Sequence, residues 1–428
     1  MNHLADFADS ESEVRYYCRQ IPNLFVKANG SLVWDAEGTE FIDFLAGCGA
    51  LNYGHNHPKI KSALLDYLHA DGIGCALDLH TGAKLAFIRA FRDIVLSPAG
   101  MNYRMQFTGP TGANAVEAAL KLARKHTGRT NIVAFTNAFH GMSLGALSAT
   151  GSNRAREGLQ GCLDGVVRLA FDGYHGAGPS DLERFAAMAE DPSGGIDPIA
   201  AIIVETVQGE GGLNLASKEW LRSLREVATR LGALLIVDDI QAGCGRSGRF
   251  FSFQDAAIAP DMVCLAKSLS GGGLPMSLLL IDPSIDTWRP GEHNGTFRGN
   301  NLAFVTARAA LELWSGSDFL AEIAIRSAML DRWLKDLCVR YPRTITRKKG
   351  IGMMAGFECC SPALARDISQ EAFKRRLLLE LCGPRDEVVK ILAPLNIDLS
   401  VFREGLTRLA AAVDAVALED AKKPDLAA

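Results

Sequence analysis

Several features are scarce in this sequence, and each absence excludes a class of protein. No run approaches the roughly 18 uninterrupted apolar residues of a membrane-spanning helix, so we expect no membrane partner. The ten cysteines form no C-x-x-C pair and no framework spacing, which favours reduced thiols in a cytoplasmic protein. The net charge of −4 provides no positive field for nucleic acid. Residues 1–13 are acidic and lack a long apolar core, so we expect no signal peptide.

The remaining composition is that of a globular α/β protein. Hydrophobic residues make up 48% of the 428 residues and charged residues 22%, enough for a substantial core. From about residue 60 to 310, helical and strand patterns alternate, which predicts a mainly parallel central sheet. We therefore expect an N-terminal segment (1–60) that packs with a smaller α/β domain (316–428), and a large domain between them (61–315).

Two apolar runs end in side chains that carry chemistry. Residues 233–237 are followed by Asp238, and residues 261–266 are followed by Lys267. Short apolar runs bounded by turn residues are typical of strands buried on both faces. Ligands of open α/β sheets bind at the carboxyl ends of such strands. An acid and a lysine are therefore predicted at one functional edge.

This pair suits a pyridoxal phosphate site. A lysine in an apolar site is more easily deprotonated, so Lys267 can form a Schiff base with an aldehyde. A carboxylate such as Asp238 can pair with a protonated pyridine nitrogen. Each residue taken alone also fits an ordinary strand end or a solvated lysine.

Three further strand ends carry candidate residues. Residues 108–114 form a glycine-rich turn before a helix, which suits an anion but also fits a plain strand-to-helix connection. Phe139 follows another strand, where it can stack on a planar ring or belong to the core. Glu205 and Glu210 follow a third; an aromatic content of only 7% does not support a glycosidase pair. Two histidines, at positions 55 and 57, lack companions at ligand spacing, so no metal site is predicted.

Over about residues 20–415, the chain resembles the class III (ω-amino) branch of pyridoxal phosphate aminotransferases of fold type I. The segment 238–248, D-D-I-Q-A-G-C-G-R-S-G, is similar to the family's D-E-V-Q-x-G-x-G-R-T-G, and Lys267 follows at the family's spacing. The resemblance implies that Asp238 binds the ring nitrogen and Gln241 the ring hydroxyl. Lys267 is implied as the catalytic lysine, which holds the cofactor and later moves a proton.

The resemblance also implies the remaining cofactor contacts. Gly112 and Ala113 match the family's phosphate-binding backbone, and Phe139 occupies the place of the stacking aromatic. Thr296 matches a threonine that reaches the phosphate from the neighbouring subunit, which implies a homodimer or a higher homo-oligomer built of dimers. Residues 205–212 match the family's E-P-V-Q-G-E-G-G, although a threonine replaces its proline.

Within the family, residues 107–112 and 291–301 most resemble diaminobutyrate–2-oxoglutarate aminotransferases. Those enzymes exchange an amino group between glutamate and aspartate 4-semialdehyde, giving 2,4-diaminobutyrate for ectoine, siderophores or peptide antibiotics. The same residues leave open an ornithine or 4-aminobutyrate transaminase. An aminomutase, racemase or decarboxylase of the same fold also stays open, as does a non-enzymatic sensor.

Two positions depart from the family pattern. Met142 and Lys390 stand where many relatives carry arginines that serve substrate carboxylates. A lysine offers a point charge in place of a bidentate fork. Arg298 and Lys390 are therefore the predicted substrate-carboxylate residues, with Glu210 as the resting partner of Lys390. A structural bridge across the dimer is the other interpretation of Arg298.

Overall fold

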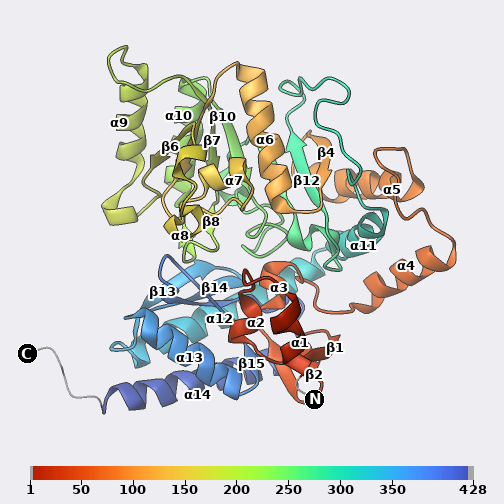
Figure 1. The fold of residues 1–428 in the computed structure, drawn as a ribbon, viewed down its shortest axis with the longest axis vertical. Coiled ribbons are helices and arrows are strands. Elements are labelled where there is room, and N and C mark those ends of the chain that lie inside the picture. The colour runs from red at the N-terminus through yellow and green to blue at the C-terminus, as the bar shows by residue number, and fades with distance from the viewer. Residues whose placement is uncertain (1–2, 423–428) are drawn as a thin grey trace, which may run out of the picture.

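The computed structural model describes residues 3–422, which form two lobes (Figure 1). The large lobe is built on a seven-stranded sheet. Its strands, in their order across the sheet, are β4 (Arg104–Gly109), β12 (Ser277–Ile281), β11 (Met262–Leu265), β10 (Leu234–Asp238), β7 (Ile199–Val204), β5 (Asn131–Phe135) and β6 (Val166–Leu169). Only β12 runs antiparallel to its neighbours, so the predicted mainly parallel α/β fold is confirmed. Strand β12 is not among the elements that the sequence predicts.

Helices cover both faces of this sheet because its strands are apolar on both sides. In β10, Leu235 and Val237 pack into one core cluster, while Leu234 and Ile236 pack into another. The first cluster includes residues of α10 (Lys218–Arg230), and the second includes those of α6 (Gly112–Thr127). The other helices of this lobe are α4 (Pro58–His69), α5 (Gly82–Phe91), α7 (Leu144–Ala149), α8 (Asn153–Arg156), α9 (Pro179–Glu190) and α11 (Asn301–Leu311). None of the helices within residues 3–422 is long and apolar enough to cross a membrane.

The small lobe combines both ends of the chain. One of its sheets is antiparallel, with the order β13 (Ile345–Ile351), β14 (Met354–Cys359), β17 (Val388–Ile391) and β16 (Glu380–Cys382). The other has the order β1 (Phe25–Asn29), β2 (Leu32–Asp35), β3 (Glu40–Asp43) and β15 (Leu377–Leu378). The helices are α12 (Asp318–Arg340), α13 (Pro362–Lys374) and α14 (Leu399–Asp420). The pairing of β3 with β15 joins the N-terminal strands to this lobe, while the domain boundaries at 60 and 315 stay a prediction.

The apolar segment 377–381 is divided between the two sheets of the small lobe. Its first two residues form β15 beside β3, and Glu380 begins β16 beside β17. In β16, Glu380 lies directly opposite Lys390 of β17. Residues opposite each other on antiparallel strands present their side chains to the same face. This division therefore brings a glutamate against the buried lysine.

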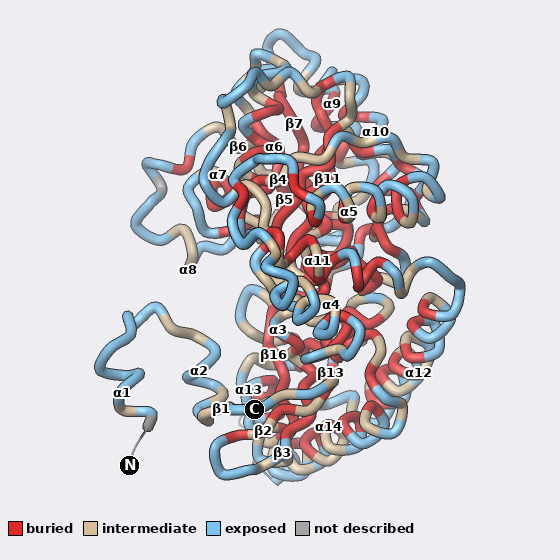
Figure 2. Tube along the Cα trace, turned by 90° about the vertical axis from the view of Figure 1, so that its right-hand side faces the viewer, coloured by how far each residue is buried: buried red, intermediate tan, exposed pale blue. Residues whose placement is uncertain are grey.

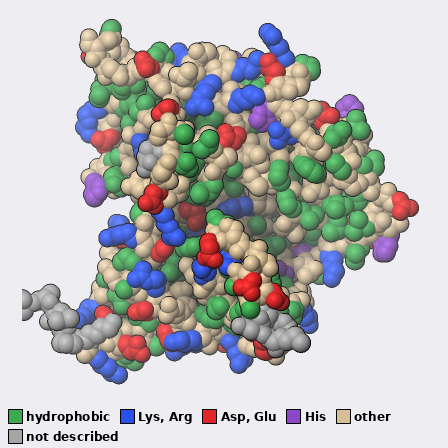
Figure 3. Space-filling view, in the orientation of Figure 1, with side chains coloured by type: hydrophobic (Ala, Val, Ile, Leu, Met, Phe, Trp, Pro, Cys, Tyr) green, Lys and Arg blue, Asp and Glu red, His purple; other side chains and the backbone are tan. Residues whose placement is uncertain are grey.

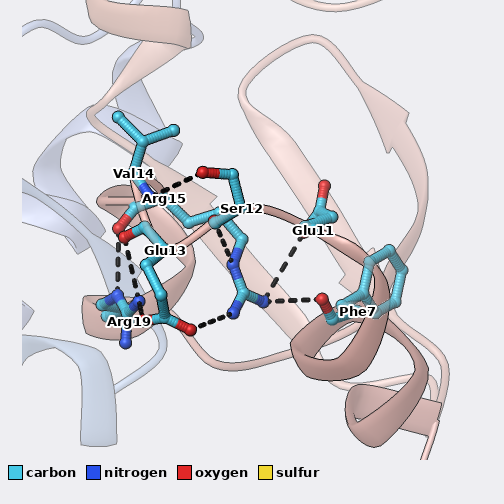
Figure 4. Close-up of polar contacts among 7 residues, drawn as sticks. All are labelled: Phe7, Glu11, Ser12, Glu13, Val14, Arg15 and Arg19. Atoms are coloured by element: carbon cyan, nitrogen blue, oxygen red, sulfur yellow. Dashed lines mark hydrogen bonds and ion pairs between the residues drawn. The ribbon is translucent and has the colours of Figure 1, made fainter.

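An N-terminal arm lies along the outside of the small lobe. It contains α1 (His3–Ser10) and α2 (Tyr17–Gln20), and Figure 2 shows it as a largely exposed segment. The turn between the helices is held by two arginines (Figure 4). Arg15 Nη1 donates to Phe7 O at 2.9 Å, and Arg19 Nε donates to Arg15 O at 3.0 Å. Helix α2 begins with Tyr17, whose hydroxyl donates to Glu380 at 3.0 Å.

Candidate active site

A cavity of about 520 Å³ lies at the carboxyl ends of β10 and β11. Figure 3 shows the surface hollowed where the two lobes meet. Seven of the predicted site residues line the cavity: Gly112, Ala113, Phe139, Glu210, Asp238, Gln241 and Lys267. Thr296, Arg298 and Lys390 do not line it. The carboxyl-edge geometry therefore gathers the residues that follow neighbouring strands, as expected for an open α/β sheet.

Lys267 is held in an unusual backbone conformation directly after β11. Its φ of 51° lies in the left-handed region, which costs a non-glycine residue of order 1–3 kcal/mol. The following turn fixes this conformation, since Ser268 Oγ donates to Gly49 O at 2.6 Å and Leu269 N donates to Ala266 O at 3.0 Å. Among residues 3–422, no group accepts a hydrogen bond from Lys267 Nζ. The amine is thus held at the cavity wall and available to a ligand.

Asp238, at the end of β10, is held by a buried histidine. Its side chain is buried, Oδ1 accepts from Ile240 N at 3.2 Å, and Oδ2 lies 2.7 Å from His140 Nδ1. A carboxylate oxygen can only accept, so His140 Nδ1–H donates to it, and the fully buried ring fixes the orientation of Asp238. No role of His140 is predicted from the sequence pattern. The available signal is its position directly after Phe139 at a strand-end turn.

The start of α6 forms an anion cradle beside these residues. The backbone N–H groups of Gly112 and Ala113 belong to the first helical turn, where they have no partner within the helix. A side chain at Gly112 would approach Ile240 to 2.7 Å, so glycine keeps the cradle open. Unpaired N–H groups at the positive end of a helix dipole suit a phosphate.

Gln241 and Phe139 complete the fit to a planar, phosphorylated ring. Gln241 Oε1 is buried without a hydrogen-bond partner, so it can accept from a ligand hydroxyl. Phe139 is half-buried at the cavity wall, and its backbone N–H donates to Glu205 Oε1 at 2.9 Å. Together with Lys267 and Asp238, these groups fit the pyridoxal phosphate that the sequence implies. Within the described residues, no three His, Cys, Asp or Glu side chains gather to hold a metal ion.

Glu205 lines the cavity and connects two loops, one that carries Phe139 and one that carries Gly209. Its Oε1 accepts from the Phe139 backbone, and its Oε2 accepts from Gly209 N at 3.2 Å. Burial raises the pKa of Glu205 to about 7, although His140 opposes the shift. Glu205 therefore positions the loop that carries Phe139 and His140.

Glu210 belongs to a group of three ionisable side chains that extends away from the cavity. We call this group the ion triplet: Glu210, Glu380 and Lys390. Lys390 Nζ lies 2.9 Å from Glu210 Oε1 and 3.0 Å from Glu380 Oε2, and its side chain is 0% exposed. Gln241 Nε2 also donates to Glu210 Oε1, at 3.1 Å. Only Glu210 of the triplet lines the cavity. Lys390 is therefore separated from the cavity by the carboxylate it holds.

Opposite charges decide the protonation states of Glu210 and Lys390. Burial alone would raise the pKa of Glu210, but Lys390 and Lys267 outweigh it and lower the pKa to about 2. Burial alone would lower the pKa of Lys390, but Glu210 and Glu380 hold it well above its ordinary value. At neutral pH Glu210 is a carboxylate and Lys390 an ammonium.

Thr296 and Arg298 lie away from this cavity in the single chain. Thr296 is exposed on the loop before α11. Arg298 lines a separate pocket of about 300 Å³ together with Trp288 and His293. Its Nη2 donates to Asn294 O at 3.3 Å, while its Nε is buried without a partner. Their predicted roles toward phosphate and substrate remain predictions.

Replacing Asp239 with asparagine should stabilise the protein in a pH-dependent way. Ser252 N donates to Asp239 Oδ2 at 3.1 Å, Oδ1 is buried without a partner, and burial raises the pKa from 3.8 to about 7. The contribution of Asp239 to wild-type stability therefore falls as the pH rises from about 4 to about 7, since ionisation favours the unfolded chain.

An amide does not ionise, so the advantage of Asp239→Asn should grow across that pH range and level off above pH 7. Each pKa unit corresponds to about 1.4 kcal/mol, and the unpaired amide offsets part of the gain. We therefore expect Asp239→Asn to be more stable than wild type by roughly 1–3 kcal/mol at pH 8. Thermal melting of both cofactor-free proteins from pH 4 to 8 measures it. A difference that does not change with pH would contradict the raised pKa.

Comparison with known proteins identifies the family. Residues 16–413 match the family described as "Aminotransferase class-III". This match covers most of the chain, and the chain therefore belongs to the class-III aminotransferase family.

Individual relatives agree with this membership. The chain is 52% identical over 402 residues to a diaminobutyrate–2-oxoglutarate transaminase of Vibrio cholerae, covering 94% of this chain and 97% of that protein. It is 48% identical over 410 residues to the enzyme of the same name from Halalkalibacterium halodurans, covering 96% of each. Among solved structures, ornithine aminotransferase of Toxoplasma gondii matches with a TM-score of 0.85 at 27% identity, covering 98% of this chain and 95% of that one. That structure holds pyridoxal phosphate at partial occupancy in its active site.

Proposed function

We propose that the protein transfers an amino group from L-glutamate to the distal carbonyl of L-aspartate 4-semialdehyde, giving L-2,4-diaminobutyrate and 2-oxoglutarate. The cofactor is pyridoxal phosphate. One observation supports this most strongly: Lys267, Asp238, Gln241 and the start of α6 line one cavity. They do so in a chain about half identical to diaminobutyrate–2-oxoglutarate transaminases.

Each wall of the cavity contributes one task to this reaction. The N–H groups of Gly112 and Ala113 would bind the phosphate, and Phe139 would pack against the ring. Asp238, oriented by His140, would pair with the ring nitrogen. Lys267 Nζ would hold the cofactor before substrate enters and would then remove and return the proton on the substrate carbon that carries the amino group. When bound, the cofactor supplies the electron sink that makes this proton movement feasible.

An assay with purified, cofactor-loaded protein tests the proposal. Glutamate and aspartate 4-semialdehyde should yield 2-oxoglutarate and diaminobutyrate in equal amounts. An aminomutase, racemase or decarboxylase would release no 2-oxoglutarate. A clear preference for glutamate 5-semialdehyde or succinate semialdehyde as acceptor would indicate the ornithine or 4-aminobutyrate reaction.

We further propose that the protein is a homodimer whose sites are shared between subunits. The loop that carries Thr296 is linked to residues 73–80, because Asn294 Nδ2 donates to Asp78 Oδ2 at 3.3 Å. Both segments expose large apolar side chains, which supports an interface there: Ile73, Leu77, Leu79 and Phe297. Across such an interface Thr296 would reach the partner's phosphate cradle, and Arg298 is proposed to serve a substrate carboxylate there.

Two inactive variants should complement each other if sites are shared. Lys267→Ala removes the lysine of its own site, while Thr296→Ala removes a contact made to the partner's site. A mixed dimer then contains one site with both residues intact, so each mixed dimer formed by subunit exchange should have up to about half the activity of a wild-type dimer. Exchange is verified with differently tagged subunits. Absence of recovery in verified mixed dimers would contradict the shared site.

The cellular setting is part of the same proposal. All ten cysteines are free, four of them buried, which supports a reducing compartment and hence the cytoplasm. We propose that the diaminobutyrate made here supplies ectoine, siderophore or peptide-antibiotic synthesis.

A further inference from the structure

The ion triplet carries more negative than positive charge. It combines the carboxylates of Glu210 and Glu380 with the single ammonium of Lys390. Glu380 is anchored in this arrangement by two contacts besides the strand register. Its Oε2 lies 3.0 Å from Lys390 Nζ, and its Oε1 accepts from the Tyr17 hydroxyl at 3.0 Å. The side chain of Glu380 is 3% exposed, so it cannot turn outward into solvent.

Glu210 is the one member of the ion triplet that is partly exposed, and only its Oε1 accepts a hydrogen bond. Lys390 and Gln241 both donate to Oε1, at 2.9 and 3.1 Å. No group within residues 3–422 donates to Oε2. The side chain is 31% exposed and lines the same cavity as Lys267. Glu210 therefore offers the cavity an oriented carboxylate with a free acceptor oxygen.

We propose that the ion triplet recognises the ammonium group at the non-reacting end of a diamino acid. Glu380 compensates the charge of Lys390, so that Glu210 keeps a net negative charge for the substrate. With Glu210 as its only partner, Lys390 would form a neutral pair with little attraction for a cation. This inference rests on the proposed function and names the substrate group that Glu210 binds. It makes Lys390 and Glu380 positioning residues, while Glu210 contacts the substrate.

A matched pair of substrates isolates this contact. 2,4-Diaminobutyrate and 4-aminobutyrate share a primary amine on C4 and a carboxylate on C1. They differ at C2, where only the first carries an ammonium group. The ratio of their specificity constants therefore reports recognition of that ammonium, and changes common to both amines cancel.

The test compares Glu210→Gln, Glu380→Gln and wild type with both amines. Each variant removes one carboxylate charge at nearly constant size. Glu404→Gln, an exposed glutamate on α14, controls for the substitution itself. We measure kcat/KM for each amine and, in a Lys267→Ala background that cannot react, the Kd of each by calorimetry. Both triplet variants should lower the diaminobutyrate to 4-aminobutyrate ratio at least about tenfold, the size of a charge-assisted hydrogen bond, while Glu404→Gln leaves it unchanged.

The outcomes separate this inference from the function it rests on. If wild type does not transaminate diaminobutyrate, the proposed function is wrong, whatever the variants do. If wild type does so and the ratio is unchanged in Glu210→Gln, the ammonium contact is wrong. If the ratio falls in Glu210→Gln but not in a folded, cofactor-binding Glu380→Gln, the compensating role of Glu380 is overturned. Calorimetry gives the ratio even if 4-aminobutyrate is bound but not turned over.

Discussion

Lys267→Ala should eliminate both the covalent attachment of the cofactor and turnover. The variant lacks the only amine that the structure holds at the carboxyl end of β11 inside the cavity lining. It thereby loses the Schiff-base nucleophile and the proton carrier together, and proton transfer alone contributes about 10²–10⁴-fold. We expect the half-reaction with glutamate to slow at least about 10³-fold.

Reduction with borohydride followed by peptide mass spectrometry checks the attachment. Wild type should carry the reduced cofactor on the peptide that contains Lys267, and the variant should carry none. Lys335→Ala, an exposed lysine on α12, is the matched control and should behave as wild type. A labelled cofactor fixed to another lysine of the variant, with turnover preserved, would contradict the assignment.

Lys390→Met should cause a large loss of stability. Lys390 lies between two carboxylates and has no exposed surface, so methionine fills its volume but removes the cation that Glu210 and Glu380 both contact. Removing one partner of a buried ion group costs about 3–5 kcal/mol. We expect the free energy of unfolding at pH 7, measured in urea, to fall by this amount in Lys390→Met. Lys335→Met breaks an exposed pair with Asp331, and it should lower the free energy of unfolding by at most about 1 kcal/mol.

The loss should also depend on pH with a defined sign. In wild type the pKa of Glu210 is lowered from 4.5 to about 2, so its contribution is complete above about pH 4.5 and is lost as the pH falls toward 2. The variant lacks that contribution, and protonation relieves its unpaired carboxylates. The difference between the two proteins should therefore shrink below about pH 4.5. A difference that widens on acidification would show that Lys390 does not stabilise ionised glutamates.

The central strands and their functional edge could be predicted because the signals are local. The apolar runs that became β7, β10 and β11 are continuous in sequence, and parallel strands place their carboxyl ends at one edge. Asp238 and Lys267 are therefore brought together by a general property of the fold. The helix that begins at Gly112 follows its strand by the same logic.

The ion triplet could not be predicted in full because it depends on contacts distant in sequence. Nothing local indicates that segment 377–381 divides between two sheets, yet that division sets Glu380 opposite Lys390. Tyr17 reaches Glu380 from the other end of the chain. The predicted resting pair of Glu210 and Lys390 is present at 2.9 Å. The sequence pattern does not indicate that Lys390 also contacts a second carboxylate, that of Glu380.

His140 and Thr296 show two other limits. His140 contacts Asp238 only because the loop after β5 reaches the end of β10 at the cavity, which is a matter of packing. Thr296 lies outside the cavity of its own chain, so its predicted role would require a second copy of the chain.

The position of the transferred nitrogen tests the account most directly. Cofactor-loaded protein is incubated with [¹⁵N]glutamate and aspartate 4-semialdehyde, and the diaminobutyrate is analysed by NMR. We predict that the label appears only on C4, because the distal carbonyl accepts the amino group while the C2 ammonium is held by Glu210. Label on C2, or the absence of labelled diaminobutyrate while another aldehyde is aminated, would contradict the proposed function.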